Sequence, residues 1–311
     1  MDTASKALAA AGHPEAPRIR READAYRTDL RRGFETMRQH APVVRLRDGR
    51  WVPHYPSRLY WRGRDIGWIR EVLEGAVYLP LSGLYDASGP QAQWILDDYQ
   101  DNRYVKPPFG YPIVNFEANW FDRGGFSIQP NLLAGLIPHL DRDEPEIFLW
   151  MFFNAWSACY REEINAMVEH PNPELGHSTA AHFKTSDESN AISWLRGMFV
   201  YTNEKLLHIG RALPREWLAS GRPCETSGVC TPYGTVDVSY RSTPSNEQIA
   251  ATLDLRLRRP PPAILVRFRH PEQRSLRSVR VNGEAWNRFD PQRNDVDITG
   301  FSGRVEVLAE F

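Results

Sequence analysis

The sequence has little of what several large classes of protein require. Three cysteines in 311 residues, an odd number with no C-x-x-C pair, indicate neither a disulfide framework nor a cysteine zinc site. No apolar run approaches the ~20 residues of a membrane span, and residues 1–24 contain no apolar core of the signal-peptide type. The formal net charge of -1 lacks the basic surplus of a nucleic-acid or anionic-membrane face. We therefore expect a cytoplasmic protein without nucleic-acid or membrane partners.

Signals for a cofactor or a metal are also missing. Gly124-Gly125 favours a tight turn, because no phosphate loop or dinucleotide fingerprint surrounds it. His170, His177 and His182 are seven and five residues apart, which fits no standard set of metal ligands. We expect neither a cofactor nor a metal. Cys224 and Cys230 are near enough in sequence for a disulfide, but a reducing cytoplasm favours free thiols.

Aromatic residues, in contrast, are abundant. The chain has ten tryptophans, and 41% of its residues are hydrophobic. The tryptophans have two interpretations: they pack a core, or they line a carbohydrate cleft, because indoles stack on the apolar faces of sugars. The length predicts one large domain or two.

The first two thirds of the chain have helical patterning. Apolar residues recur every three or four positions from 17 to 40 and predict an amphipathic helix that Pro42 ends. Residues 43–62, rich in proline and aromatics, predict an extended loop. Two further long loops, at 102–129 and 169–185, are expected to be functional because long loops in compact domains usually are. Further helices are expected at 66–73, 90–101, 132–140, 147–159, 186–199 and 214–220.

The pattern changes near Arg222, where apolar residues begin to alternate with polar ones. This period of two predicts strands with one buried face, separated by turns of proline, glycine and asparagine. Their spacing of about a dozen residues predicts a small antiparallel β-sandwich. We therefore expect an α+β protein with a helical domain at residues 1–222 and a sandwich at 223–311. The strands are expected around 236–240, 249–257, 264–268, 279–281, 296–298 and 305–307.

Three stretches carry a resemblance to a known family. They are 207–218 (LHIGRALPREWL), 231–236 (TPYGTV) and 279–283 (VRVNG). Together with helices followed by a sandwich, they resemble the C-terminal part of six-hairpin, (α/α)6-toroid glycosidases of the α-L-rhamnosidase type. The resemblance covers roughly residues 15–310. It implies that the first stretch closes the toroid and the other two belong to the sandwich.

The resemblance implies only half of a toroid. Six or seven helices are expected before residue 222, whereas a complete toroid has about twelve. The chain is therefore expected to be a partial (α/α) toroid of helical hairpins. A partner chain, self-association into a homo-oligomer or a missing N-terminal half would complete it, or the chain is a reduced relative. The apolar helix faces of a half toroid would form an interaction surface.

The first aromatic segment, residues 102–129, supplies candidate catalytic carboxylates. Glu117 and Asp122 flank Trp120, and desolvation among aromatic rings raises the pKa of a carboxyl group, as a general acid requires. The alternative is a carboxylate that anchors the loop by accepting bonds from main-chain N–H groups. Tyr111 and Gln129 are candidate substrate-binding residues of the same segment.

The second segment, residues 169–185, contains Glu169, His170 and Lys184. In α-L-rhamnosidase-type proteins a glutamate between late hairpins is a catalytic carboxylate, and the resemblance implies that role for Glu169. His170 would orient a sugar hydroxyl or tune Glu169, or form a loop hydrogen bond. Lys184 belongs to a loop-to-helix entry and would alternatively bind an acidic sugar.

The favoured hypothesis is a glycoside hydrolase acting on an oligo- or polysaccharide. Such hydrolysis needs two carboxyl groups about 5 to 9.5 Å apart, one protonated and one ionised. Glu117 or Asp122 would pair with Glu169. A non-catalytic carbohydrate-binding or interaction module is the main alternative, and a polysaccharide lyase using Tyr111, His170 and Lys184 is another. The expected sugar-stacking residues are Trp120, Tyr111, Trp61 and Trp51.

Overall fold

The computed structural model describes residues 1–46, 48–56, 76–99, 136–162, 165–167, 185–219, 221–243 and 245–311. The chain divides into two compact units. The first comprises Met1–Pro138, Ala158–Arg161 and Val168–His182, and the second His139–Ser157, Glu162–Met167 and Phe183–Phe311. Among the helices in these ranges, none has the length and apolar character needed to cross a membrane.

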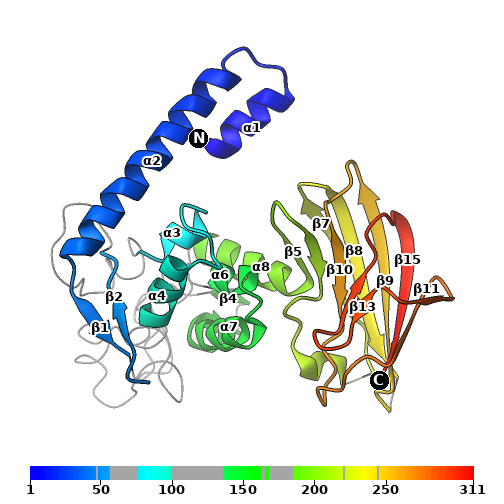
Figure 1. Cartoon of the computed structure of the whole chain (residues 1–311). Coiled ribbons are helices and arrows are strands. Elements are labelled where there is room, and N and C mark those ends of the chain that lie inside the picture. Colours follow the sequence, from blue (N-terminus) through cyan, green and yellow to red (C-terminus); the bar gives the residue numbers. More distant parts are fainter. Residues whose placement is uncertain are drawn as a thin grey trace. The chain divides into compact units, whose positions relative to one another are not determined.

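The first unit begins with a helical hairpin of α1 (Asp2–Ala10) and α2 (Ala16–His40) (Figure 1). Arg20 of α2 donates to Asp2 of α1 over 2.6 Å. Phe34 and Met37 of the apolar stripe of α2 are buried. The helix expected at 17–40 is therefore confirmed.

A short antiparallel hairpin follows α2. Strands β1 (Val43–Arg45) and β2 (Trp51–Pro53) pair with each other, and Val44 and Val52 pack with Trp94. The expected loop at 43–62 is wrong at these strands, because the valines pair across a turn in which Gly49 has a φ of 88°. Two helices follow, α3 (Tyr78–Leu81) and α4 (Pro90–Tyr99). The helix expected at 66–73 lies outside the described residues.

The second unit contains α8 (Thr185–Phe199) and all but the last two residues of α7 (Pro145–Cys159). Phe152 of α7 stacks on Trp156 at 5.6 Å and meets Trp194 of α8 edge-on at 6.4 Å. The helices expected at 147–159 and 186–199 are confirmed, and that at 214–220 is a 3-10 turn. The other short described elements are α6 (Leu136–Asp141), β3 (Tyr160–Arg161), which is assigned to the first unit, β4 (Ala166–Met167) and the 3-10 helix η4 (Arg215–Leu218).

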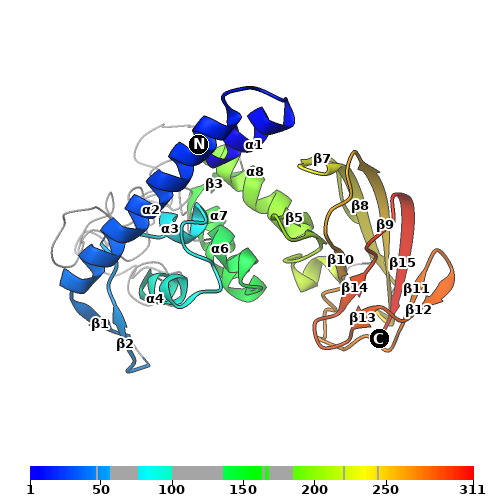
Figure 2. The ribbon, with the colours of Figure 1, turned by 45° about the horizontal axis from the view of Figure 1, so that its top comes forward.

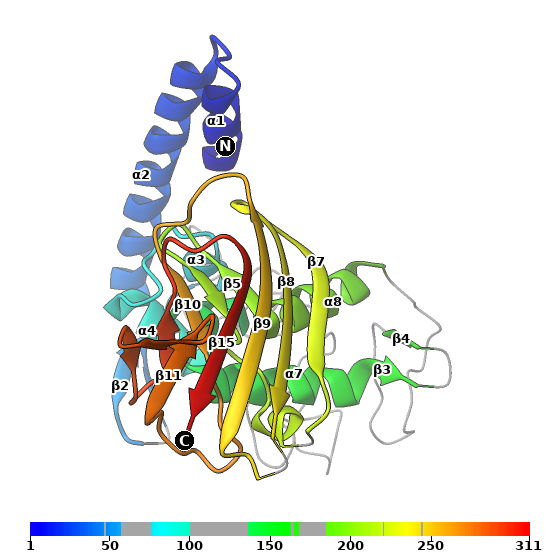
Figure 3. The ribbon, with the colours of Figure 1, turned by 90° about the vertical axis from the view of Figure 1, so that its right-hand side faces the viewer.

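Two sheets form the larger part of the second unit. One has the strand order β12-β11-β15-β9-β8-β7 and is antiparallel; the other has the order β13-β14-β10-β6-β5 (Figures 2 and 3). The strands are β5 (Val200–Thr202), β6 (Leu207–Ile209), β7 (Cys224–Thr231), β8 (Gly234–Ser242), β9 (Gln248–Leu257), β10 (Ile264–Arg267), β11 (Ser278–Val281), β12 (Glu284–Trp286), β13 (Phe289–Asp290), β14 (Asp295–Asp297) and β15 (Gly303–Glu310).

The sheets are joined by a core of alternating side chains. Residues of β8 alternate between buried and more exposed, as expected for a strand with one covered face. Tyr240 of β8 meets Phe268, just beyond β10, edge-on at 5.7 Å, and its hydroxyl donates to the Arg267 carbonyl over 3.1 Å. This hydrogen bond connects the two sheets directly.

The structure is α+β, and most of its strand pairs are antiparallel. The purely antiparallel expectation is wrong for β6 and β10, which pair in parallel. Parallel neighbours need a long crossover, and here β7, β8 and β9 of the other sheet lie between them in the sequence. The five-stranded sheet includes β5 and β6, which precede Arg222. The division into residues 1–222 and 223–311 stays a prediction.

The two cysteines that share β7 are free thiols. Cys224 lies opposite Tyr240 and Cys230 opposite Thr235 in the register of β7 with β8. Six residues of strand separate their Cα atoms by about 20 Å, far beyond disulfide reach. Burial raises the pKa of the Cys224 thiol to about 11, so it is unreactive at neutral pH.

Candidate functional site

The residues on which the sequence-based chemistry depends lie outside the described residues. Trp51, the remaining sugar-stacking candidate, is on β2 with 63% of its surface exposed. The roles of the candidates outside the described residues stay predictions. These candidates are Glu117, Asp122, Glu169, Tyr111, Trp120, Gln129, His170, Lys184 and Trp61.

The stretches that carry the family resemblance include a strand end and two turns between strands. Leu207–Ile209 forms β6, and Gly210 directly after it has a φ of 72°. Residues 231–236 span the end of β7, the turn after it and the start of β8. Asn282 and Gly283, with φ values of 50° and 85°, form the two-residue turn between β11 and β12. These residues therefore have architectural roles.

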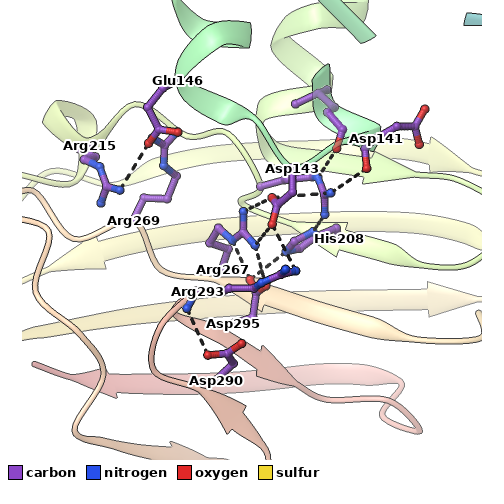
Figure 4. Close-up of polar contacts among 12 residues, drawn as sticks. Asp141, Asp143, Glu146, His208, Arg215, Arg267, Arg269, Asp290, Arg293 and Asp295 are labelled. Atoms are coloured by element: carbon purple, nitrogen blue, oxygen red, sulfur yellow. Dashed lines mark hydrogen bonds and ion pairs between the residues drawn. The ribbon is translucent and has the colours of Figure 1, made fainter. Parts of the chain in front are cut away.

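The main polar site described in the second unit is a cluster of four buried residues and one partly exposed residue, here called the Arg267 cluster. His208, Arg267 and Asp295 come from the neighbouring strands β6, β10 and β14 (Figure 4). Arg267 and Asp295 are register partners, with Nε to Oδ1 at 2.8 Å and Nη2 to Oδ2 at 2.6 Å. Such a two-point contact is a strong form of ion pair. The remaining members are Asp143, which binds Arg267, and Arg211, which binds His208.

Asp143 connects this cluster to the turn before α7. Arg267 donates to both carboxylate oxygens of Asp143, the Nη2–Oδ2 distance being 3.0 Å. Asp143 has a φ of 62°. Arg211 holds the same turn by donating from Nε to the Leu140 carbonyl over 2.6 Å, and its Nη2 is 3.6 Å from Asp143. The cluster therefore joins the start of α7 to the five-stranded sheet.

The hydrogen bonds of His208 define its protonation. Its Nδ1 faces Arg211, which can only donate, so Nδ1 accepts and the proton is on Nε2, 3.0 Å from Asp295. Burial, with help from Arg211 and Arg267, lowers the pKa of His208 to about 4 despite Asp295. Burial opposes ionisation of Asp295, but His208 and Arg267 outweigh it and hold its pKa well below the usual range. At neutral pH the cluster thus contains a neutral imidazole and ionised carboxylates.

These protonation states predict that the folded protein becomes less stable as the pH falls. The His208 pKa is about 4 when folded and near 6.5 when unfolded, so its contribution is complete above pH 6.5 and is lost as pH falls. Asp295, whose folded pKa is depressed, adds to the loss below about pH 4. We expect the free energy of unfolding, from urea titrations, to fall by a few kcal/mol between about pH 6.5 and 4.5.

The variant His208→Gln provides the control for this pH dependence. An amide at this position does not titrate, so the slope of stability against pH between about 6.5 and 4.5 should flatten. An unchanged slope in His208→Gln would show that other groups cause the acid sensitivity.

A second polar cluster lies in the first unit around Glu35 of α2. Its Oε1 accepts from the hydroxyls of Tyr55 at 2.9 Å and Tyr85 at 3.0 Å, and Oε2 accepts from Arg38 at 2.8 Å. Partial burial opposes ionisation, but these three donors together lower the Glu35 pKa. Because Glu35 stays ionised, it is unsuited to act as a general acid near neutral pH.

The Arg267 cluster was missed from the sequence, although a signal was present. In the run from Val266 to His270, arginines alternate with apolar residues, and every residue of the run is buried. Buried arginines require partners, and the acidic residue in the later strand at 295–297 supplies one. Among the described ranges, no group of three or more histidine, cysteine or acidic side chains is arranged to hold a metal.

Comparisons with known proteins assign no family. No family model and no curated protein matches the chain. A solved structure named "Glycoside hydrolase" is similar with a TM-score of 0.39 and 11% identity, covering 80% of this chain and 47% of that one. The chain thus spans about half the length of the structure it matches. Neither the family nor the activity follows from this similarity.

Proposed function

We propose that this chain is a glycosidase-like protein that binds an oligo- or polysaccharide and hydrolyses its glycosidic bonds with paired carboxyl groups. Glu169 would work with Glu117 or Asp122. One group would protonate the leaving oxygen, while the other, ionised, would act as base or nucleophile. Trp120, Tyr111, Trp61 and the exposed Trp51 would stack on sugar rings.

The proposal rests on where the structure places the three stretches that carry the family resemblance. Gly210 needs a left-handed backbone, and Asn282-Gly283 forms a tight turn of the sandwich. The backbone conformation at these positions thus explains why glycine and asparagine occur in the stretches that carry the resemblance. They support an architecture of helices followed by antiparallel sheets, and the partial (α/α) toroid is part of the proposal.

The two polar clusters support a catalytic site elsewhere in the chain. Glycoside hydrolysis needs a carboxyl group that is protonated at working pH. Asp143, Asp295 and Glu35 all have lowered pKa values because basic side chains bind them. None of these three is suited to be the acid, and we assign that role to the carboxylates of the aromatic segments.

The test is a screen of the full chain on aryl glycosides and polysaccharides with single variants. We expect Glu117→Gln or Asp122→Asn, and Glu169→Gln, to lower kcat/KM about a hundredfold, because each removes one member of the carboxyl pair. The control Glu284→Gln changes an exposed glutamate of β12 and should leave kcat/KM unchanged. Unchanged turnover in both Glu117→Gln and Glu169→Gln would remove these assignments.

The rival is an interaction module, or a subunit completed by another chain. Three large apolar side chains on α7 and α8 are exposed and favour it, because an interface would cover such groups: Trp150, Phe153 and Ile192. The rival predicts saccharide binding without turnover, or a mass in solution above 35.8 kDa for a chain that acts only when assembled. A strictly monomeric chain that turns over a glycoside would exclude it.

A further inference from the structure

A cavity of about 270 Å³ lies beside the Arg267 cluster, at the start of α7. Its described lining comes from the second unit alone. Four arginines, at 215, 267, 269 and 293, line it with two acidic residues, Asp143 and Glu146, so the formal charge of its lining is +2. The volume is near the lower end of the ~300–1,000 Å³ range of small-molecule sites. The cavity therefore has the size and charge for a small anion.

Arg269 is the residue that indicates a ligand. Its side chain is only 4% exposed, and its Nη2 donates to Oε1 of Glu146 over 2.9 Å. Its Nη1 is buried and has no hydrogen-bond partner among the described residues. Burial lowers the Arg269 pKa to about 10, yet the group stays charged at neutral pH. A buried charged donor without an acceptor is costly, so this guanidinium has unused capacity for an anion.

Glu146 marks where a bound carboxylate would lie. Its side chain is 67% exposed, and one oxygen, Oε1, is 2.9 Å from Arg269 and 3.6 Å from Nη2 of Arg215 (Figure 4). This single-oxygen contact leaves the second Nη of Arg269 unused. A ligand carboxylate presenting both oxygens would satisfy both nitrogens and still reach Arg215. The exposed Glu146 side chain can move into solvent to admit it.

Neutral polar side chains complete the lining. Gln273, Ser275 and Gln292 line the cavity, and their side chains form no hydrogen bond within the described part of the chain. Amides and hydroxyls of this kind pair with the hydroxyl groups of a sugar. The cavity therefore combines a site for one carboxylate with free groups for several hydroxyls.

We propose that this cavity binds a small polyhydroxylated carboxylate, a hexuronic acid or a related sugar acid, whose carboxylate displaces Glu146 from Arg269 and Arg215. The hydroxyl groups of the ligand contact Gln273, Ser275 and Gln292. The site goes beyond the proposed hydrolysis and does not depend on it, because the argument for it uses none of the proposed catalytic residues.

Isothermal titration of the full chain tests the ligand class with four probes: galacturonate, galactose, acetate and inorganic phosphate. Galacturonate should bind with a stoichiometry of one. Galactose lacks the carboxylate and acetate lacks the hydroxyls, so each should bind at least about tenfold more weakly. Absence of galacturonate binding overturns the proposal. Phosphate binding as tight as galacturonate overturns it too, because the site would then recognise anions in general.

Three variants test the geometry with opposite expected signs. Arg269→Gln and Arg215→Gln should each weaken galacturonate binding about tenfold, whereas Glu146→Gln should tighten it about threefold, because it removes the competing charge. Arg288→Gln, an exposed arginine of the same unit outside the cavity, should have no effect.

Thermal unfolding checks that each variant is folded. If Arg269→Gln does not fold, Arg215→Gln and Glu146→Gln decide the matter. Weaker binding in Glu146→Gln, or equal losses in Arg215→Gln and Arg288→Gln, would overturn the assignment.

Discussion

Replacing Asp295 by asparagine should lower the free energy of unfolding by about 3–5 kcal/mol. Asp295 is 7% exposed and accepts two hydrogen bonds from Arg267 and one from His208. The asparagine keeps the shape but removes the charge, so Arg267 retains Asp143 alone as its ionic partner. Most of the loss comes from a buried guanidinium that has lost one of its two carboxylate partners.

Asp297→Asn is the matched control for this prediction. Asp297 lies two residues further on the same strand and pairs with Arg288 over 2.6 Å, but the side chains of this pair are 36% and 46% exposed. Exposed ion pairs contribute at most about 1 kcal/mol, so Asp297→Asn should change little. Urea unfolding of both variants at pH 7.5 provides the comparison. Similar losses in the two would show that the Arg267 cluster does not stabilise the fold more than a surface pair.

Replacing Gly210 by alanine should cost about 2–5 kcal/mol, from two separate causes. The φ of 72° puts a side-chain-bearing residue into the strained left-handed region. The new Cβ would also lie 2.7 Å from the Arg267 carbonyl oxygen and against the Tyr240 hydroxyl, which is nearer than real Cβ contacts come. The substitution would therefore disturb the hydrogen bond that joins the two sheets.

The variant Gly283→Ala separates the cost of backbone strain from the cost of steric crowding. Gly283 has a φ of 85°, but nothing lies within 4 Å of a Cβ built there. This variant should cost only the backbone strain, about 1–2 kcal/mol. Thermal unfolding followed by circular dichroism should therefore give a clearly lower Tm for Gly210→Ala. Equal shifts of Tm would mean that crowding at Gly210 is relieved by small movements of Tyr240.

The helices and most strands of the described structure could be predicted because their patterns are local. Burial of one stripe gives α2 its period of three to four, and burial of one face gives β8 its alternation. Strands β5 and β6 were missed because each has only three residues, too few to show a period. The hairpin at Val43–Pro53 was missed because proline and aromatic content suggested a loop.

The candidate sites also differ in how far the sequence alone reveals them. Glu117 and Asp122 were chosen because they lie within an aromatic segment, and Glu169 because the family resemblance implies its role. The roles of all three stay predictions. The cavity of the second unit has no such signal, since Glu146, Arg215 and Arg269 are separated by long stretches of sequence. No rule of spacing relates them.

The sequence by itself determined the α+β class, the positions of the long helices and strands, and the lack of basic surplus charge, because composition and period are properties of neighbouring residues. Only the tertiary structure decided that Arg267 lies between Asp143 and Asp295, and that β6 pairs in parallel with β10. Such contacts depend on register and crossover between distant segments. The free energy that selects them comes from burying charges with their partners, which is established only when the chain is folded.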